Sequence, residues 1–190
     1  NFGGYFASIS GKNNAGKTTA EVRPFENALI ITRDSVESLF NIAAGVTAFE
    51  DTSLVINSFA KELSGLRAVK FNFKKQVREG SSFMFTNEKP IKVLVGYFKK
   101  QRAAFTTDTV YLKEPELETN ASADDYGQAD IKISNAIAIE GMPPVNIHAY
   151  SFKAGQHTIK LERGVCLILG FVDGDTVVPV YDAGLTGDLR

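Results

Sequence analysis

The feature that most constrains this chain is an alternation of apolar and polar residues with a period of two, the pattern of β-strands. In residues 67–74, Val69, Phe71 and Phe73 share one face, and lysine and asparagine side chains share the other. A strand of this kind has one face against a core and one face in water. The chain should therefore fold mainly through β-sheet.

Other segments extend this pattern. Residues 81–86 follow Glu79 and Gly80, so we expect them to form a hairpin with the preceding strand. Residues 91–98 follow a proline, are almost wholly apolar, and should form a central strand. Further strands are expected over residues 131–139, 145–152, 157–161 and 165–172. Short strands separated by Gly, Pro and Asn turns favour a mostly β, jelly-roll-like antiparallel β-sandwich over βαβ units.

One short helix is expected near residue 40. Asp34 can act as its N-cap, Glu37 completes a capping box, and Gly45 is placed to end it. The apolar residues at helical spacing are Val36, Leu39, Phe40 and Ala43. We expect this helix to close one end of the sandwich.

Length and charge restrict the class of protein. The 190 residues, 44% of them hydrophobic, suit a single domain over residues 1–190, with residues 1–25 as an arm or edge strand. A net charge of -1 gives no electrostatic case for nucleic acid or an anionic membrane. No apolar run approaches the ~20 residues of a membrane-spanning helix. The chain begins without methionine and without a signal peptide, so we expect a mature secreted protein or one module of a longer chain.

Cysteine and histidine are too scarce for several common sites. One cysteine excludes an internal disulfide and a cysteine-rich zinc site, and two histidines exclude a multi-histidine metal centre. Cys166 lies in a run that is apolar on both faces, so we expect a buried and unreactive thiol.

Residues 11–18 match the phosphate-loop pattern G-x-x-x-x-G-K-[ST]. A phosphate loop must open a long helix whose N-terminal amides face the anion. Pro24 would stop such a helix after barely two turns, and the chain lacks βαβ alternation. We therefore interpret the match as a turn with exposed lysines.

The strand over residues 145–152 places Asn146, His148 and Tyr150 on one face. An amide, an imidazole and a phenol in a row can hydrogen-bond sugar hydroxyls and stack on a pyranose ring. A solvated outer face without a ligand is the alternative. His148 and Tyr150 could also serve as a base and acid in β-elimination on an acidic sugar.

The acidic segment 113–130 interrupts the strand pattern. Asp124, Asp125 and Asp130 could bind Ca²⁺ through oxygen ligands, although their spacing is not that of an EF-hand. Tyr126 could serve as a platform for a sugar ring. A solvated acidic turn is the alternative interpretation.

Residues 66–185 resemble the galactose-binding-like, jelly-roll β-sandwich modules of secreted glycan-processing proteins of gut bacteria. The stretches that carry the resemblance are residues 91–98, 149–159 and 164–171. The resemblance implies a jelly-roll sandwich, a carbohydrate-linked role, and a secreted, periplasmic or cell-surface location.

The sequence thus predicts a non-catalytic carbohydrate-binding or accessory module of a larger exported protein. Its partners would be a glycan or a neighbouring domain. No cofactor is expected, and Ca²⁺ is the one ion that the acidic segment could bind. The expected ligand contacts are Asn146, His148, Tyr150, Tyr126 and Asp125. A jelly-roll polysaccharide lyase or glycoside hydrolase is one alternative, and a purely structural interaction module is another.

Overall fold

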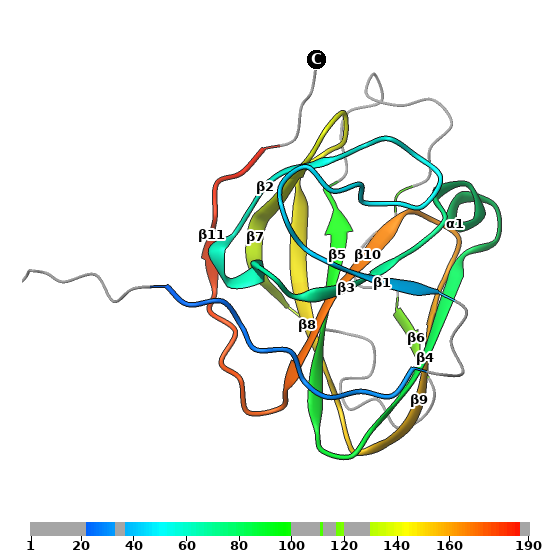
Figure 1. Cartoon of the computed structure of the whole chain (residues 1–190), viewed down its shortest axis with the longest axis vertical. Coiled ribbons are helices and arrows are strands. Elements are labelled where there is room, and N and C mark those ends of the chain that lie inside the picture. The colour runs from blue at the N-terminus through cyan, green and yellow to red at the C-terminus, as the bar shows by residue number, and fades with distance from the viewer. Residues whose placement is uncertain (1–21, 33–36, 100–110, 112–116, 120–129, 187–190) are drawn as a thin grey trace, which may run out of the picture.

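The computed structural model describes residues 22–32, 37–99, 111, 117–119 and 130–186. These residues form antiparallel sheets and one short α-helix, so the predicted mostly β sandwich is confirmed (Figure 1). The phosphate-loop match lies outside the described residues, and residues 22–32 beyond it form no helix. Within the described part of the chain, no helix has the length and apolar character needed to cross a membrane.

The largest sheet forms the centre of the molecule. Its strands, in spatial order, are β10 (Cys166–Asp173), β5 (Ile91–Phe98), β8 (Val145–Phe152), β7 (Ile131–Ile139) and β11 (Tyr181–Asp182), and β2 (Ile56–Phe59) also pairs with β7. Neighbours are antiparallel, except that β11 runs parallel to β7. The predicted central strand β5 does lie inside this sheet, between β8 and β10.

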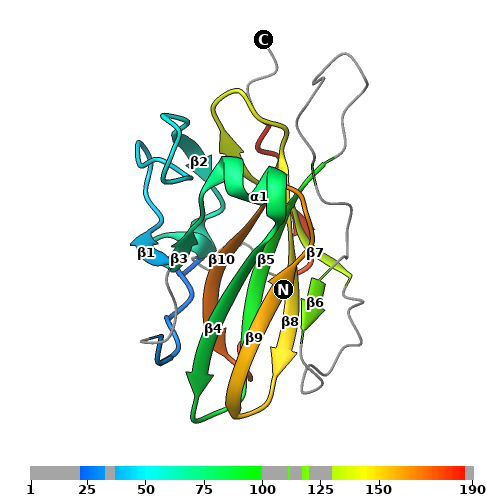
Figure 2. The ribbon, with the colours of Figure 1, turned by 90° about the vertical axis from the view of Figure 1, so that its right-hand side faces the viewer.

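Two smaller sheets complete the fold. The strands β4 (Ser81–Asn87), β9 (Gly155–Leu161) and β6 (Leu117–Thr119) form one sheet, and β1 (Ser38–Asn41) and β3 (Arg67–Lys70) form the other. In the side view, the β4-β9-β6 sheet lies in front of the central sheet, and β1, β2 and β3 lie to its left (Figure 2).

One hydrophobic core lies between the central sheet and the β4-β9-β6 sheet. Phe83 and Phe85 of β4 contact the ring of Phe171 of β10, with centroid distances of 5.6 and 5.4 Å. Tyr150 and Phe152 of β8 belong to the same core. These side chains hold the two layers of the sandwich together.

A second core covers the opposite face of the central sheet. The segment between β1 and β3, which includes β2 and the 3₁₀ turn η1 (Lys61–Leu63), packs there through Phe49, Leu63 and Leu66. Leu94 of β5 and Leu167 of β10 lie in this core, whereas their chain neighbours lie in the first one. Burial on both faces explains why β5 and β10 are almost continuously apolar.

The prediction of a helix near residue 40 is wrong. Ser38–Asn41 is strand β1, which pairs antiparallel with β3, and residues 33–36 lie outside the described residues. The ammonium of Lys70 on β3 lies over the ring of Phe40, 4.6 Å from its centroid. Pairing with β3 and this cation–π contact favour the strand over the local helical spacing.

The helix occurs instead at α1 (Phe73–Glu79), where the sequence pattern predicted strand and hairpin. Asn72 caps it by accepting a hydrogen bond from Lys75 N at 2.8 Å. The Asp51 carboxylate accepts bonds from Phe73 N and Lys74 N, at 2.6 and 3.1 Å. These bonds satisfy amides that a helix leaves free. Because α1 separates β3 from β4, β4 pairs with β9 and the predicted hairpin does not form.

Candidate functional site

The predicted ligand row on β8 is buried rather than exposed. Asn146, His148 and Tyr150 are 7%, 2% and 1% exposed. The alternation in β8 was correctly predicted, but β8 lies inside a sheet with a core on each face. The expectation of a solvated face able to stack on a sugar is therefore wrong for this row.

The row instead makes contacts within the protein. The Tyr150 hydroxyl lies 3.3 Å from that of Tyr97, and the His148 ring meets the Tyr97 ring edge-on at 5.2 Å. Asn146 Oδ1 accepts a hydrogen bond from Asn135 N at 3.0 Å. Polar groups paired in this way can be buried at little cost.

The predicted acidic site is mostly beyond the described residues. Asp124, Asp125 and Tyr126 are outside them, and Asp130 is exposed. In the described ranges, no three His, Cys, Asp or Glu side chains gather in a way that could hold a metal ion. The Ca²⁺ site and the sugar platform at Tyr126 remain predictions.

Cys166 is fully buried, as predicted. Burial raises the pKa of its thiol far above the ordinary value, and a contact from Gln76 Nε2 at 3.6 Å opposes this only in part. Because the thiolate is the reactive form, this cysteine is not poised as a nucleophile.

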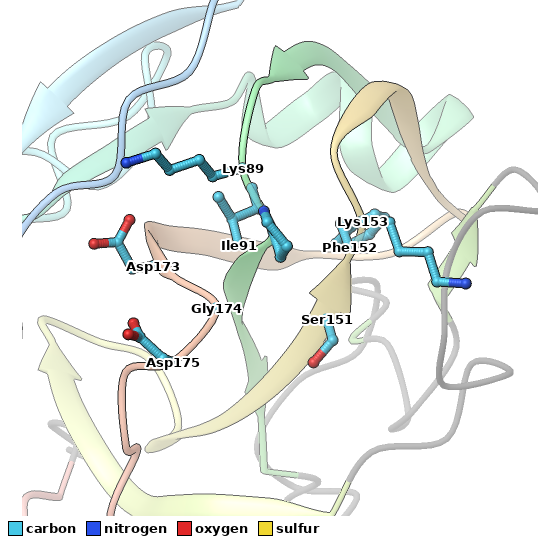
Figure 3. Close-up of a pocket in the computed structure, with 9 residues that line it drawn as sticks. Lys89, Ile91, Ser151, Phe152, Lys153, Asp173, Gly174 and Asp175 are labelled. Carbon is cyan, nitrogen blue, oxygen red and sulfur yellow. The ribbon is translucent and has the colours of Figure 1, made fainter.

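A pocket of about 560 Å³ opens at one end of the sandwich (Figure 3). Its size is within the range of ligand pockets, roughly 300–1,000 Å³. Three chain segments line it: the turn between β4 and β5 with the start of β5, the end of β8 with the turn to β9, and the end of β10 with the turn after it. The lining residues are Lys89, Pro90, Ile91, Ser151, Phe152, Lys153, Asp173, Gly174 and Asp175.

Asn87 ties two of these turns together. Its Nδ2 donates to Lys89 O at 2.7 Å and to Lys153 O at 3.1 Å. His157 Nε2 lies 2.6 Å from the same Lys153 oxygen, and a carbonyl can only accept, so the ring donates here. Asn87 and His157 are both buried, so the frame beneath these turns is fixed by packing as well as by hydrogen bonds.

The third turn is attached to the same frame. Gly174 N donates to Pro90 O at 2.9 Å, and Lys92 Nζ donates to Thr176 O at 2.6 Å. A side chain at Gly174 would place a Cβ 3.0 Å from Pro90 O, tighter than ordinary contact. The pocket is therefore held in shape without a ligand, which lowers the entropic cost of binding.

The rim carries charges that are free for a ligand. Lys89, Asp173 and Asp175 are exposed. Among the residues that the structure describes, Arg78–Glu79 is the one ion pair. Lys89, Asp173 and Asp175 therefore form no ion pair with another described residue. Carboxylates accept hydrogen bonds from hydroxyls and an ammonium donates them, which suits a polyhydroxylated ligand.

Sequence reasoning missed this pocket because its residues come from three turns far apart in the chain. One feature of the sequence did point to part of the pocket. Ser151, Phe152 and Lys153 lie in residues 149–159, which carry part of the resemblance to glycan-linked modules. Only the pairing of β5 with both β8 and β10 brings the ends of these strands together.

The fold is similar to part of a solved glycan-targeting enzyme. No family model and no curated protein matches the chain. Among solved structures, it is similar to a GH138 enzyme targeting pectin rhamnogalacturonan II, with 31% sequence identity and a TM-score of 0.71. The match covers 87% of this chain and 18% of that one, so the chain spans about a fifth of the length of the enzyme.

Proposed function

We propose that this chain is a non-catalytic, carbohydrate-binding accessory module of a larger exported glycan-processing protein. One observation carries the proposal. Nearly the whole chain, 87% of it, matches a stretch that makes up 18% of a glycan-targeting enzyme. A β-sandwich that recurs as a small part of such an enzyme suits a module that holds glycan or supports a neighbouring domain.

The pocket supports the binding role. It is pre-shaped by the bonds of Asn87, Lys92 and Gly174, and its rim offers Lys89, Asp173 and Asp175 to a ligand. Loops at the end of a rigid sandwich are a common place for binding residues. The proposed glycan site is therefore this pocket rather than the buried row on β8.

A glycoside hydrolase is the second candidate, because the structural neighbour is itself an enzyme. Hydrolysis requires two carboxylates on either side of a glycosidic bond. In the pocket, these would be Asp173 and Asp175. A lyase that uses His148 and Tyr150 is disfavoured, since both side chains are buried.

A structural module is the third candidate. Leu29, Val177 and Val180 are 92%, 82% and 72% exposed. Exposed aliphatic side chains of this kind are what a contact with another domain would cover.

The test is a glycan array that includes pectic oligosaccharides, run with the wild type and with a triple variant, Lys89→Ala, Asp173→Ala and Asp175→Ala. Glu88→Ala is the matched control, because Glu88 is an exposed charge in the turn beside Lys89 that does not line the pocket. We expect binding by the wild type and the control and loss of binding in the triple variant.

Two results would overturn the proposal. Absence of binding across the array would favour the structural module. New reducing ends released from a bound glycan, and abolished in the triple variant, would show a hydrolase.

A further inference from the structure

We infer that Val177, Val180 and Tyr181 form a docking surface for another domain of the same polypeptide, beside the glycan pocket. These three residues are called the valine patch below. The inference rests on the proposed function, in which the chain is one module of a larger protein, and it names the face that the neighbouring domain covers.

The valine patch lies on the segment between β10 and β11, at the edge of the molecule (Figure 1). Val177 and Val180 are 82% and 72% exposed, and Tyr181 is 38% exposed. Three residues of chain span at most about 11 Å, so both valines fall within one small area. The exposed carboxylates of Asp175 and Asp182 flank it. An apolar area with a charged border is typical of a surface that contacts another protein.

The backbone of the valine patch is fixed before any partner binds. Lys92 Nζ donates to Thr176 O at 2.6 Å. Val178, which lies between the two valines in the chain, is 8% exposed and belongs to a hydrophobic core. The Tyr181 hydroxyl donates to Glu62 Oε1 at 2.6 Å. Little chain freedom is therefore lost on docking, which lowers its entropic cost.

The charges around the valine patch are balanced. Lys92 donates to the carbonyl that follows Asp175 in the chain. Lys99 and Asp182 are both hydrogen-bonded to the side chain of Asn135. Two lysines thus accompany two aspartates, so attraction between opposite net charges does not drive docking. Burial of apolar surface does, and docking should change little with salt.

The size of the valine patch favours a linked domain over a second copy of the chain. Each of the three side chains offers on the order of 100 Å² of surface. A stable interface between free proteins buries about 800 Å² on each partner, well above this total. A domain on the same polypeptide meets the patch at an effective concentration of about millimolar, so a small contact suffices.

The similar enzyme supports such an arrangement. The stretch that matches this chain, with 31% sequence identity, makes up 18% of that enzyme. On this chain, Asp175 lines the pocket, and Val177 is two residues further on, so their Cα atoms are at most about 7 Å apart. A domain docked on the valine patch would therefore border the pocket and lie next to the glycan held there.

The test compares the 190-residue chain with the longer polypeptide in which it is encoded, by hydrogen–deuterium exchange of backbone amides. We expect amides of residues 176–182 to exchange at least tenfold more slowly in the longer polypeptide, because the docked domain covers them. Added salt should leave this protection unchanged. The 190-residue chain should sediment as a monomer.

Val177→Asp with Val180→Asp is the decisive variant. We expect it to lose the protection in the longer polypeptide, since docking would bury two carboxylates. Its melting temperature in the 190-residue chain should equal that of wild type, because both side chains are exposed. Val177→Ser with Val180→Ser is a second variant, in case the aspartates disturb folding, and it should lose the protection in the same way.

Leu29→Asp is the matched control. Leu29 is 92% exposed and lies on the segment before β1, apart from the valine patch in the chain. The control should keep the protection. An equal loss in the control would show that the contact is not made by the valine patch and would overturn the assignment.

Other results would also contradict the inference. Equal exchange at residues 176–182 in the two polypeptides would show that no domain docks there. A stable dimer of the 190-residue chain that both patch variants abolish would replace the linked domain with a second copy. None of these results bears on the glycan array, where absence of binding would overturn the proposed carbohydrate-binding role whether or not a domain docks.

Discussion

Asn135 adopts a conformation that few residues tolerate. Within the described residues it is the one non-glycine with positive φ, at 48°, and it lies where the β7–β8 register shifts. Its Nδ2 donates to Asp182 at 2.8 Å, and its Oδ1 accepts from Lys99 Nζ at 3.1 Å. The bond from Asn135 lowers the pKa of Asp182, with help from Gly184 N. One side chain thus joins β7 to β11.

We predict that Asn135→Ala destabilises the protein more than Asn135→Gly. Both variants lose the bonds to Asp182 and Lys99, but only alanine keeps the strain of positive φ. The difference should be about 1 kcal/mol in the free energy of unfolding. Urea denaturation measures it, and equal stability of the two variants would contradict the assigned strain.

Tyr181 connects the C-terminal strand to the 3₁₀ turn η1. Its hydroxyl donates to Glu62 Oε1 at 2.6 Å, and Glu62 is 6% exposed. Desolvation, and then the bond and charge of Glu62, raise the pKa of Tyr181 to about 12. The neutral phenol is therefore the form that the fold favours.

We predict a pH-dependent cost for Tyr181→Phe. Near neutral pH the variant should lose about 1 kcal/mol of the free energy of unfolding, because the buried Glu62 carboxylate loses its hydrogen-bond donor. The loss is kept small because Tyr181 itself is partly exposed. Because folding raises the pKa of Tyr181, the neutral phenol stabilises the folded protein fully at pH values below 10.0, the pKa of an ordinary tyrosine. This stabilisation is lost as the pH rises through about 12, the pKa in the folded protein. The difference in the free energy of unfolding between wild type and variant should therefore shrink between pH 10 and pH 12. Unfolding curves at pH 7 to 12 test this, and Val180→Ala is an exposed neighbouring control.

At the scale of elements, the central strands β5, β8 and β10 pack so closely that they leave no room for added side-chain atoms. Gly96 of β5 lies where a Cβ would meet Val145 Cγ1 of β8 at 2.8 Å and Leu169 Cδ1 of β10 at 2.9 Å. We predict that Gly96→Ala destabilises by about 1–3 kcal/mol, because a packed core has no room for a methyl group. Thermal unfolding would check this, and a melting temperature equal to that of wild type would contradict the packing.

The sequence predicted β5, β7, β8 and β10 nearly to their ends, because their signal is local: alternation or continuous apolarity between turns. It misplaced the helix because the support for α1 is not local. Asp51, which accepts bonds from the first helical amides, is 22 residues from Phe73. A pattern of neighbouring residues cannot show such a contact.

At the scale of the whole molecule, the sequence could predict a glycan-linked role but not where on the fold the candidate site lies. Alternation in β8 places Asn146, His148 and Tyr150 on one face but cannot show whether another layer covers that face. The pocket is assembled by topology, since antiparallel pairing of β5 with β8 and β10 gathers three turns at one end. The glycan-linked resemblance agrees with the similarity to a glycan-targeting enzyme, although the predicted β8 row is buried.

Locating the bound glycan on the molecule tests most directly whether the pocket is the glycan-binding site. An oligosaccharide identified on the array would be titrated into isotopically labelled protein, and the perturbed amides mapped. We predict shifts concentrated at residues 87–89, 151–155 and 173–176, in the turns that the bonds of Asn87, Lys92 and Gly174 connect. Saturable binding that leaves all three turns unperturbed would contradict it.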